Sequence, residues 1–275
     1  MKTAFKILPS QKNEVALHLL MEVGWEGVSL LWYQSAPLII EGLHIFKNDK
    51  LLPGTELAYQ LKEIIQTQNL PSFTQCHILY NFKESMLVPD AFFIEKNISS
   101  MLDTLYGSQP GITVYSEAIK AMDAKNIYRV PAAVDMVLRT DFPAAVFQHS
   151  NTILLPFLQQ NQQQLFCIVY HNSIKVFLFV DYILQHVQFY PYNTPSDVAY
   201  HLLNTCQLHQ VLPAEITLTL AGFIDQDSNL YQELYRYFLH IRFNDPAADV
   251  QLNEEISQLP VHFFGHLINA AQCVL

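Results

Sequence analysis

Two histidines near the C-terminal end of the chain have a spacing that could bind a metal. His262 and His266 are four residues apart on a predicted helix, so both imidazoles could face one cation. No glutamate follows His262 as in the zinc-protease motif H-E-x-x-H, and no third ligand is evident. Because the chain has 11 histidines, such pairs also arise by chance. We therefore expect surface or packed histidines and no metal site.

The short motifs that hold phosphates or activate nucleophiles are missing from the sequence. It contains no G-x-x-x-x-G-K-[ST], no G-x-G-x-x-G and no G-x-S-x-G. These patterns supply the phosphate loop, the dinucleotide fold and the hydrolase elbow. All three classes are excluded on sequence, and no residue is assigned a catalytic role.

Composition favours a soluble protein with a large core. Of 275 residues, 51% are hydrophobic and 15% are charged, which suits two packed lobes of ordinary domain size. The four cysteines lie far apart without a CxxC spacing: Cys76, Cys167, Cys206 and Cys273. We interpret them as buried free thiols in a reducing cytosol and expect a cytoplasmic location.

Charge and hydropathy argue against nucleic acid and membranes as partners. The formal net charge is −10 and no cluster of Lys and Arg is present, whereas nucleic-acid affinity depends on such clusters. The stretch from Phe142 to Ile174 lacks acids, Lys and Arg, but its interior is rich in glutamine and contains two prolines. It is too polar for a bilayer core, so we expect no membrane span.

Two stretches of the sequence show the same order of predicted elements. Each has three strands with short connections, a helix and a buried strand. The two helices share a phrase, since E-L-A-Y-Q-L from Glu56 aligns with D-V-A-Y-H-L from Asp197. The predicted strands are Val15–Val23, Val28–Gln34, Leu38–Phe46 and Cys76–Asn81, and then Leu165–Tyr170, Ile174–Asp181, Leu184–Tyr192 and Ile216–Ala221.

The remaining segments are placed around these repeats. Met1–Asn13 is predicted to be a loose polar end, and Asp90–Tyr106 a helix that Asp90 caps. A β-α-β-α run from Ile127 to Gln160 closes the first lobe. Later segments are predicted as a helix from Asn229 to about His240, a strand at Ile241–Phe243, an acidic loop at Asn244–Glu255 and a helix from Val261.

The predicted fold class is α/β with two ribonuclease-H-like lobes of β-β-β-α-β-α type. The first lobe covers residues 1–162 and has an insertion at about 85–125. The second covers residues 163–275. The glutamine-rich run Gln159–Gln164 is either the joint between the lobes or a solvated helix end.

This doubled order resembles the superfamily of actin, sugar kinases and heat-shock chaperone ATPases, and within it the pilus-assembly and cell-division actin-like proteins. Several phrases are similar to a bacterial family of unknown function with an actin-like ATPase fold. They span most of the chain: Val23–Ser29, Leu79–Asn81 with Leu87–Pro89, Tyr128–Pro131, Asp141–Pro143 with His149, and Thr194–Asn204.

The resemblance implies a nucleotide cleft between the lobes, with ATP and Mg²⁺ held by the turn after the first strand of each lobe. Active members place an acid near each turn and a Gly-Gly pair at the adenosine. Here Gly24 and Gly27 are kept, but no aspartate precedes Gly24. His171 and Asn172 replace the acid and glycine of the second turn, and Gly222 is followed by phenylalanine.

The cleft positions implied by the resemblance are therefore Gly24, Glu26, Gly27, His171, Asn172 and Gly222. The two glycines have an ordinary explanation as well, because tight hairpin turns need positive φ. Likewise, Asn172 suits a turn because asparagine tolerates the left-handed region.

Two functions from different classes follow. We expect a protein without ATPase activity or cofactor that acts through contacts with a protein partner or as a homodimer. The alternative is an ATP-binding protein with weak ATPase or phosphotransferase activity, whose acids come from Glu26, Glu41 or Asp181. An aromatic stripe of Tyr231, Leu234, Tyr235 and Phe238 indicates either core packing or a partner-binding face.

Overall fold

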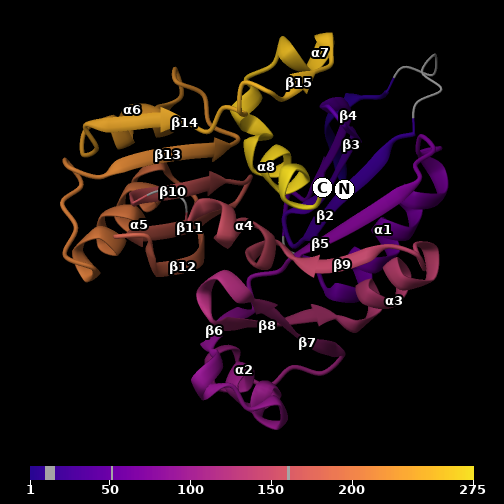
Figure 1. The fold of residues 1–275 in the computed structure, drawn as a ribbon, viewed down its shortest axis with the longest axis horizontal. Helices are drawn as coiled ribbons and strands as arrows, with labels where there is room; N and C mark the ends of the chain where they lie inside the picture. The colour runs from indigo at the N-terminus through magenta and orange to yellow at the C-terminus, as the bar shows by residue number, and fades with distance from the viewer. Residues whose placement is uncertain (10–15, 51, 160–161) are drawn as a thin grey trace.

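The computed structural model describes residues 1–9, 16–50, 52–159 and 162–275. In this part of the chain, strands form two large sheets and a third, smaller sheet (Figure 1). Helices cover the sheets, so the architecture is α/β as predicted.

The first large sheet is built around three consecutive antiparallel strands, β2 (His18–Gly24), β3 (Gly27–Ser35) and β4 (Leu38–Lys47). Strands β5 (Gln75–Asn81) and β9 (Val146–His149) continue it in parallel on the other side of β2. The spatial order is therefore β4-β3-β2-β5-β9. Two helices belong to this half: α1 (Gly54–Thr67) and α3 (Ala132–Asp141).

The second large sheet repeats this order in the second half of the chain. Its five strands run β12-β11-β10-β13-β14, which is again third, second, first, fourth and fifth in sequence. The repeated helix is α5 (Pro195–Leu208), as long as α1, and Asp197 and Glu56 each stand third in their helix. The strands are β10 (Gln163–Val169), β11 (Ser173–Val180), β12 (Ile183–Pro191), β13 (Thr217–Gly222) and β14 (His240–Phe243).

The predicted helix Asp90–Tyr106 is shorter in the structure and follows the first strand of the third sheet. Strands β6 (Ser85–Pro89), β8 (Ala124–Pro131) and β7 (Ile112–Ile119) form it, in the order β6-β8-β7. Before α2 (Ile98–Tyr106), the chain makes two short 3-10 turns, because Phe93 and Ile94 are extended and interrupt any longer helix. Asp90 therefore does not cap α2.

The outer edge of β4 is covered by segments that the sequence did not predict as strands. Residues Lys2–Ile7, expected to be loose, form β1 and pair antiparallel with β4. Residues Gln251–Leu252, expected in an acidic loop, form β15 and pair parallel with β4. Helix α7 (Glu254–Ser257) follows directly. An unpaired strand edge offers backbone donors and acceptors, which explains why these two segments pair with it.

Two C-terminal helices are shorter than predicted. Helix α6 (Asn229–Tyr235) ends before Phe238, which is buried with Leu234, whereas Tyr235 is exposed. The last helix, α8 (Gly265–Cys273), begins after a 3-10 turn at Val261–Phe263. Gly265, the first residue of α8, lies so close to Asn244 that an added Cβ would be 2.3 Å from the carbonyl oxygen of Asn244.

A single hydrophobic cluster connects the two large sheets. Helices α4 (Ser150–Leu158) and α8 lie between the sheets (Figure 1). The cluster combines Leu20 of the first sheet, Phe166 of the second and Phe264 just before α8, all almost fully buried. Strand β15 belongs to the first sheet although it lies within residues 163–275, so the limits of the two lobes remain a prediction.

Three of the four cysteines are buried, Cys76, Cys167 and Cys206, whereas Cys273 is exposed, contrary to the prediction. All four thiols are free. Three predicted segments extend beyond the described residues: Val15 of the first strand, residues 10–13 of the N-terminal end, and residues 160–161 of the glutamine-rich run. Among the helices that the structure describes, none combines the length and the apolar character needed to cross a membrane.

Candidate functional site

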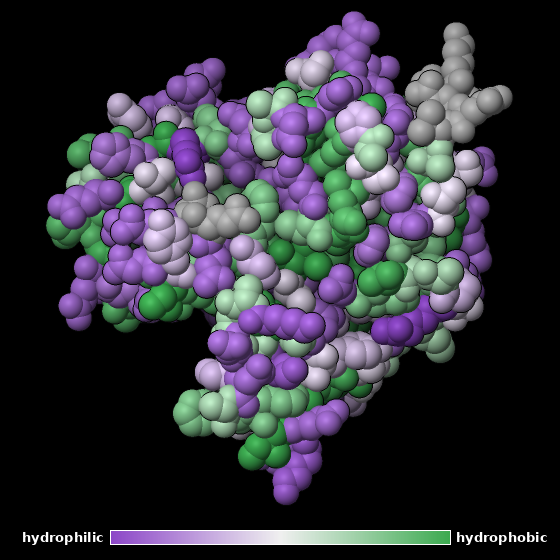
Figure 2. Space-filling view, viewed as in Figure 1, coloured by the Kyte–Doolittle hydropathy of each residue, from purple (hydrophilic) through white to green (hydrophobic). Residues whose placement is uncertain are grey.

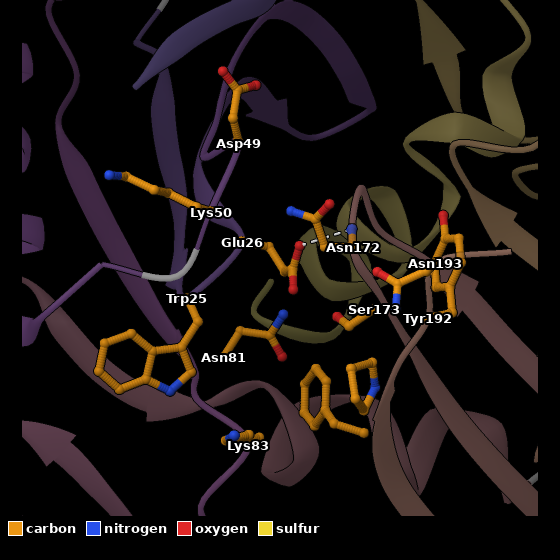
Figure 3. A pocket seen from close by; sticks show the side chains of 12 residues that line it. Trp25, Glu26, Asp49, Lys50, Asn81, Lys83, Asn172, Ser173, Tyr192 and Asn193 are labelled. Carbon is orange, nitrogen blue, oxygen red and sulfur yellow. Dashed lines mark hydrogen bonds between the residues drawn. The ribbon is translucent and has the colours of Figure 1, made fainter. Parts of the chain in front are cut away.

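The turns of the two large sheets lie opposite each other and are joined by direct contacts (Figure 3). The Oε2 atom of Glu26, in the β2–β3 turn, accepts a hydrogen bond of 3.2 Å from the backbone N–H of Asn172, in the β10–β11 turn. The Asn172 amide donates to the carbonyl oxygen of Asn48 at 3.4 Å. Asn48 in turn donates its backbone N–H to Glu26, so the turns form one connected unit.

Each glycine predicted at the cleft packs tightly against another strand. A Cβ at Gly24 would lie 2.5 Å from the carbonyl oxygen of Asn81, and one at Gly27 would lie 2.0 Å from that of Phe46. At Gly222 it would lie 2.1 Å from the carbonyl oxygen of Val169. Since Gly27 and Gly222 also have positive φ, close backbone packing alone requires glycine at these positions.

Five of the six predicted site residues meet at the facing turns. Gly24, Glu26, Gly27 and His171 line a cavity of about 30 Å³. Glu26 and Asn172 also line a larger cavity of about 360 Å³, which residues of both halves of the chain surround. Gly222 lines neither cavity, and only its neighbour Phe223 reaches the smaller one. The acids that line these cavities are Glu22 and Glu26 in the smaller one, and Glu26 and Asp49 in the larger one.

The other two acids considered for catalysis lie elsewhere. Glu41 is buried in β4, where the Gln34 side chain donates a hydrogen bond to it. Asp181 is exposed in the turn after β11, with a φ of 50°. Neither residue lines either of the two cavities, so Glu41 and Asp181 cannot place a metal at the turns.

Directly behind the turns lies a buried polar network that the sequence analysis missed. The Nζ atom of Lys175, on β11, donates to Asn81 Oδ1 at 3.0 Å and to Ser150 Oγ at 2.7 Å. The Asn81 amide donates to the hydroxyl of Tyr170 at 2.8 Å. Glu22, on β2, supplies the negative charge. The network thus joins both large sheets through side chains that are almost fully buried.

Burial opposes the charges of this network. It raises the pKa of Glu22, an effect that the nearby Lys175 ammonium and a hydrogen bond from Asn81 partly offset. It lowers the pKa of Lys175, an effect that Glu22 partly offsets. His266, on α8, has its Nε2 atom 3.8 Å from Glu22 Oε1, and burial lowers its pKa to about 3. Two opposite charges that are buried together, such as Glu22 and Lys175, are tolerated only while both are present.

A sequence signal for this network existed in the strand patterns. Glu22 is the one acid of β2, and Lys175 is the one charged residue of β11, while most of their neighbours are apolar. The two residues also belong to equivalent residue pairs in the two sheets. Glu22 pairs with Ser29 in the β2–β3 ladder, and Lys175 pairs with Ile168 at the corresponding place in the β10–β11 ladder. Charged residues are almost never buried without a partner, so each of these two residues indicated that an opposite charge lies nearby.

The environment of His149, at the N-terminus of α4, predicts how the stability of the folded chain depends on pH. Its Nδ1 atom accepts the backbone N–H of Asn151 at 3.1 Å, and its Nε2 atom lies 3.1 Å from the carbonyl oxygen of Phe82. This arrangement needs the neutral ring with the proton on Nε2. Burial, followed by the Lys175 charge, lowers the pKa from 6.5 to about 3.

Acid should therefore destabilise the protein through His149. Below pH 6.5 the unfolded chain binds a proton that the folded chain rejects, which costs about 2 kcal/mol at pH 5 from this residue alone. We expect His149→Gln to have a lower free energy of unfolding than the wild type at pH 7. Between pH 7 and pH 5, however, the variant should lose about 2 kcal/mol less of that free energy than the wild type does. Urea unfolding at both pH values measures the difference. Equal losses in the two proteins would contradict the assignment.

The two histidines with metal-like spacing have separate partners. The Nε2 atom of His262 lies 2.8 Å from the carbonyl oxygen of Ile224, whereas His266 faces Glu22. Both rings are buried, so they are packed histidines. Across the described residues, no group of three or more His, Cys, Asp or Glu side chains could hold a metal ion.

Comparison with solved structures places this geometry in a known fold. A protein with an actin-like ATPase fold and unknown function from Bacteroides thetaiotaomicron VPI-5482 superposes with a TM-score of 0.72 at 18% identity. The match covers 82% of this chain and 90% of that one. The fold class predicted from the repeated strand order is thereby confirmed.

Two further structures show the same fold at greater distance. The PilM-PilN type IV pilus biogenesis complex gives a TM-score of 0.56 at 12% identity, covering 93% of this chain and 97% of that one. The ethanolamine utilization protein EutJ from Carboxydothermus hydrogenoformans gives 0.50 at 7% identity, covering 96% and 92%.

Sequence comparison identifies the family. A search among curated proteins gave no match. The family described as "Protein of unknown function (DUF3822)" matches residues 9–241, which is most of the chain. This chain is therefore a member of the DUF3822 family, with the fold of actin-like ATPases.

Proposed function

We propose that this protein acts through contacts with other protein surfaces and does not hydrolyse ATP between its lobes. The observation that carries the proposal is the hydrogen bond from the Asn172 N–H to the Glu26 carboxylate. In a nucleotide cleft of this fold, N–H groups of the facing turns donate hydrogen bonds to the phosphates. Here such a group is already bound to an anion of the protein itself.

The charge at the turns supports the same conclusion. A phosphate entering between Glu26 and Asn172 would meet the carboxylate of Glu26 at close range, which repels it. No acid lies in the second turn to hold a metal that could offset this repulsion. Phosphoryl transfer depends on positioning and charge neutralisation, and a second turn without an acid to hold a metal lacks part of both.

A relative in fold supports action through protein contacts. PilM, which shares this fold, was solved in a complex with PilN. The network of Glu22 and Lys175 connects the two sheets behind the turns, which suits a rigid scaffold better than a cleft that opens and closes. Rigid surfaces that need little rearrangement bind partners at a lower entropic cost.

A thermal-shift titration tests the proposal. A ligand that binds only the folded chain stabilises it by RT ln(1 + [L]/Kd), so a competent cleft would raise Tm measurably in millimolar Mg-ATP or Mg-ADP. We expect no change in Tm with either nucleotide and no phosphate release. An increase in Tm that saturates with the concentration of Mg-ATP or Mg-ADP would overturn the proposal and support the ATP-binding alternative.

A further inference from the structure

The equivalent edge strands of the two large sheets differ in how they are covered. In the first sheet, the outer edge of β4 pairs with both β1 and β15. In the second sheet, the equivalent strand is β12, and within residues 1–9, 16–50, 52–159 and 162–275 only β11 pairs with it. Figure 2 shows the molecule hollowed next to this lobe, on the side where Figure 1 labels β12.

The register tells which backbone groups of β12 point outward. The Tyr192 N–H donates to the Asn172 carbonyl at 3.1 Å, so this rung of the β11–β12 ladder is hydrogen-bonded. Bonded and non-bonded rungs alternate in an antiparallel pair. Counting from Tyr192 along the regular part of β12, Val187 and Phe189 turn their N–H and C=O groups away from β11. They form an open row of donors and acceptors.

This edge lacks the charged side chains that often prevent pairing. Residues 183–193 contain no Lys, Arg, Asp or Glu, in a chain with a net charge of −10. Burial and the neighbouring His209 lower the pKa of His186 to about 4, so that ring is also neutral at pH 7. Natural edge strands are usually protected by charges, and a long uncharged edge pairs readily with another strand.

Exposed apolar side chains flank the edge on both sides. Tyr182 and Ile183 at its N-terminal end are 50% and 61% exposed. On the helix α5, His201 stacks on Tyr190 of β12 with ring centroids 4.3 Å apart. Leu208 follows His201 by two helical turns, so it lies on the same side of α5, and it is 64% exposed. The apolar surface therefore continues from the strand to the helix.

We propose that β12 pairs antiparallel with β12 of a second copy, about a twofold axis through Val187. An antiparallel pair of identical strands is self-complementary, which suits a symmetric dimer. In this register Val187 lies opposite Val187 of the second copy, and the exposed Ile183 of each copy lies toward the Pro191 end of the other. The proposal rests on the proposed function, since it names one partner surface for a protein that acts through contacts.

Symmetric cross-linking tests the register directly. In a Cys273→Ser background, Val187→Cys should form a disulfide-linked dimer on mild oxidation, because Cα atoms of a bonded rung lie about 5.5 Å apart. Tyr182→Cys is the matched control. Its two copies would lie about 30 Å apart along the paired strands, so it should remain unlinked. Equal cross-linking of both variants would overturn the proposed register.

Sedimentation equilibrium tests the dimer itself. The wild-type chain should have the mass of two copies at micromolar concentration. Val187→Pro removes an outward N–H without touching the β11 ladder, and Ile183→Lys adds a charge at the edge; both variants should sediment as monomers with wild-type circular dichroism. A monomeric wild type overturns the dimer, whether or not another protein's strand binds there. Nucleotide binding is measured separately, so a monomer that ignores Mg-ATP leaves the proposed function standing.

Discussion

Replacing Lys175 by methionine should lower the free energy of unfolding by about 3–5 kcal/mol, the usual cost of leaving one buried charge without its partner. Lys175 is fully buried and donates to Asn81 and Ser150, while Glu22 is also buried. Without the ammonium, the buried Glu22 carboxylate must remain charged without its cation or take up a proton. Guanidinium unfolding at pH 7, followed by circular dichroism, measures the loss.

The double variant Glu22→Gln with Lys175→Met provides the matched comparison. It removes both charges and leaves similar volumes, so we expect it to recover most of the stability that Lys175→Met loses. Ser150 can still donate to Asn81 Oδ1, a bond that already exists at 2.7 Å. If the double variant were as unstable as the single one, the two charges would not be acting as a pair.

Replacing Phe264 by alanine should cost about 3–5 kcal/mol, the range for deleting a buried aromatic ring. Phe264 is fully buried in the cluster that contains residues of both large sheets, and it contacts Phe5 edge-on with centroids 5.2 Å apart. Both tryptophans, Trp25 and Trp32, lie in the first half of the chain. Their fluorescence during urea unfolding reports whether loss of this contact weakens that half.

Leu239 serves as the control for Phe264. Its side chain is 67% exposed, so Leu239→Ala should change the free energy of unfolding by less than about 0.5 kcal/mol. A similar loss in both variants would mean that general apolar content matters, and not the cluster between the sheets. A small loss in Phe264→Ala would mean that the two halves are stable without that cluster.

Much of the fold was predictable because the chain uses one pattern twice. The apolar strands and the shared helix phrase at Glu56 and Asp197 determined the element order, and both helices begin where that phrase predicts. The segments predicted wrongly depend on distant partners. Lys2–Ile7 becomes a strand because β4 offers an open edge, and the extended Phe93 interrupts the helix predicted from Asp90.

The site was predictable only in part for a related reason. Turn residues such as Glu26 and Asn172 are recognisable locally, and the structure brings them together. The contact between them joins residues 146 positions apart, which no local pattern reports. Gly222 looked like an adenosine position, yet its neighbour across the ladder, Val169, already explains the glycine.

Isothermal titration calorimetry with Mg-ATP tests the central claim most directly, applied to the wild type and to Glu26→Gln at pH 7. The account predicts no binding heat for the wild type, because the Glu26 carboxylate already accepts the Asn172 N–H where a phosphate would have to enter. Removing that charge gives the turns their best chance of accepting a phosphate. Saturable one-to-one binding of Mg-ATP by the wild type would contradict the claim, whether or not Glu26→Gln binds more tightly.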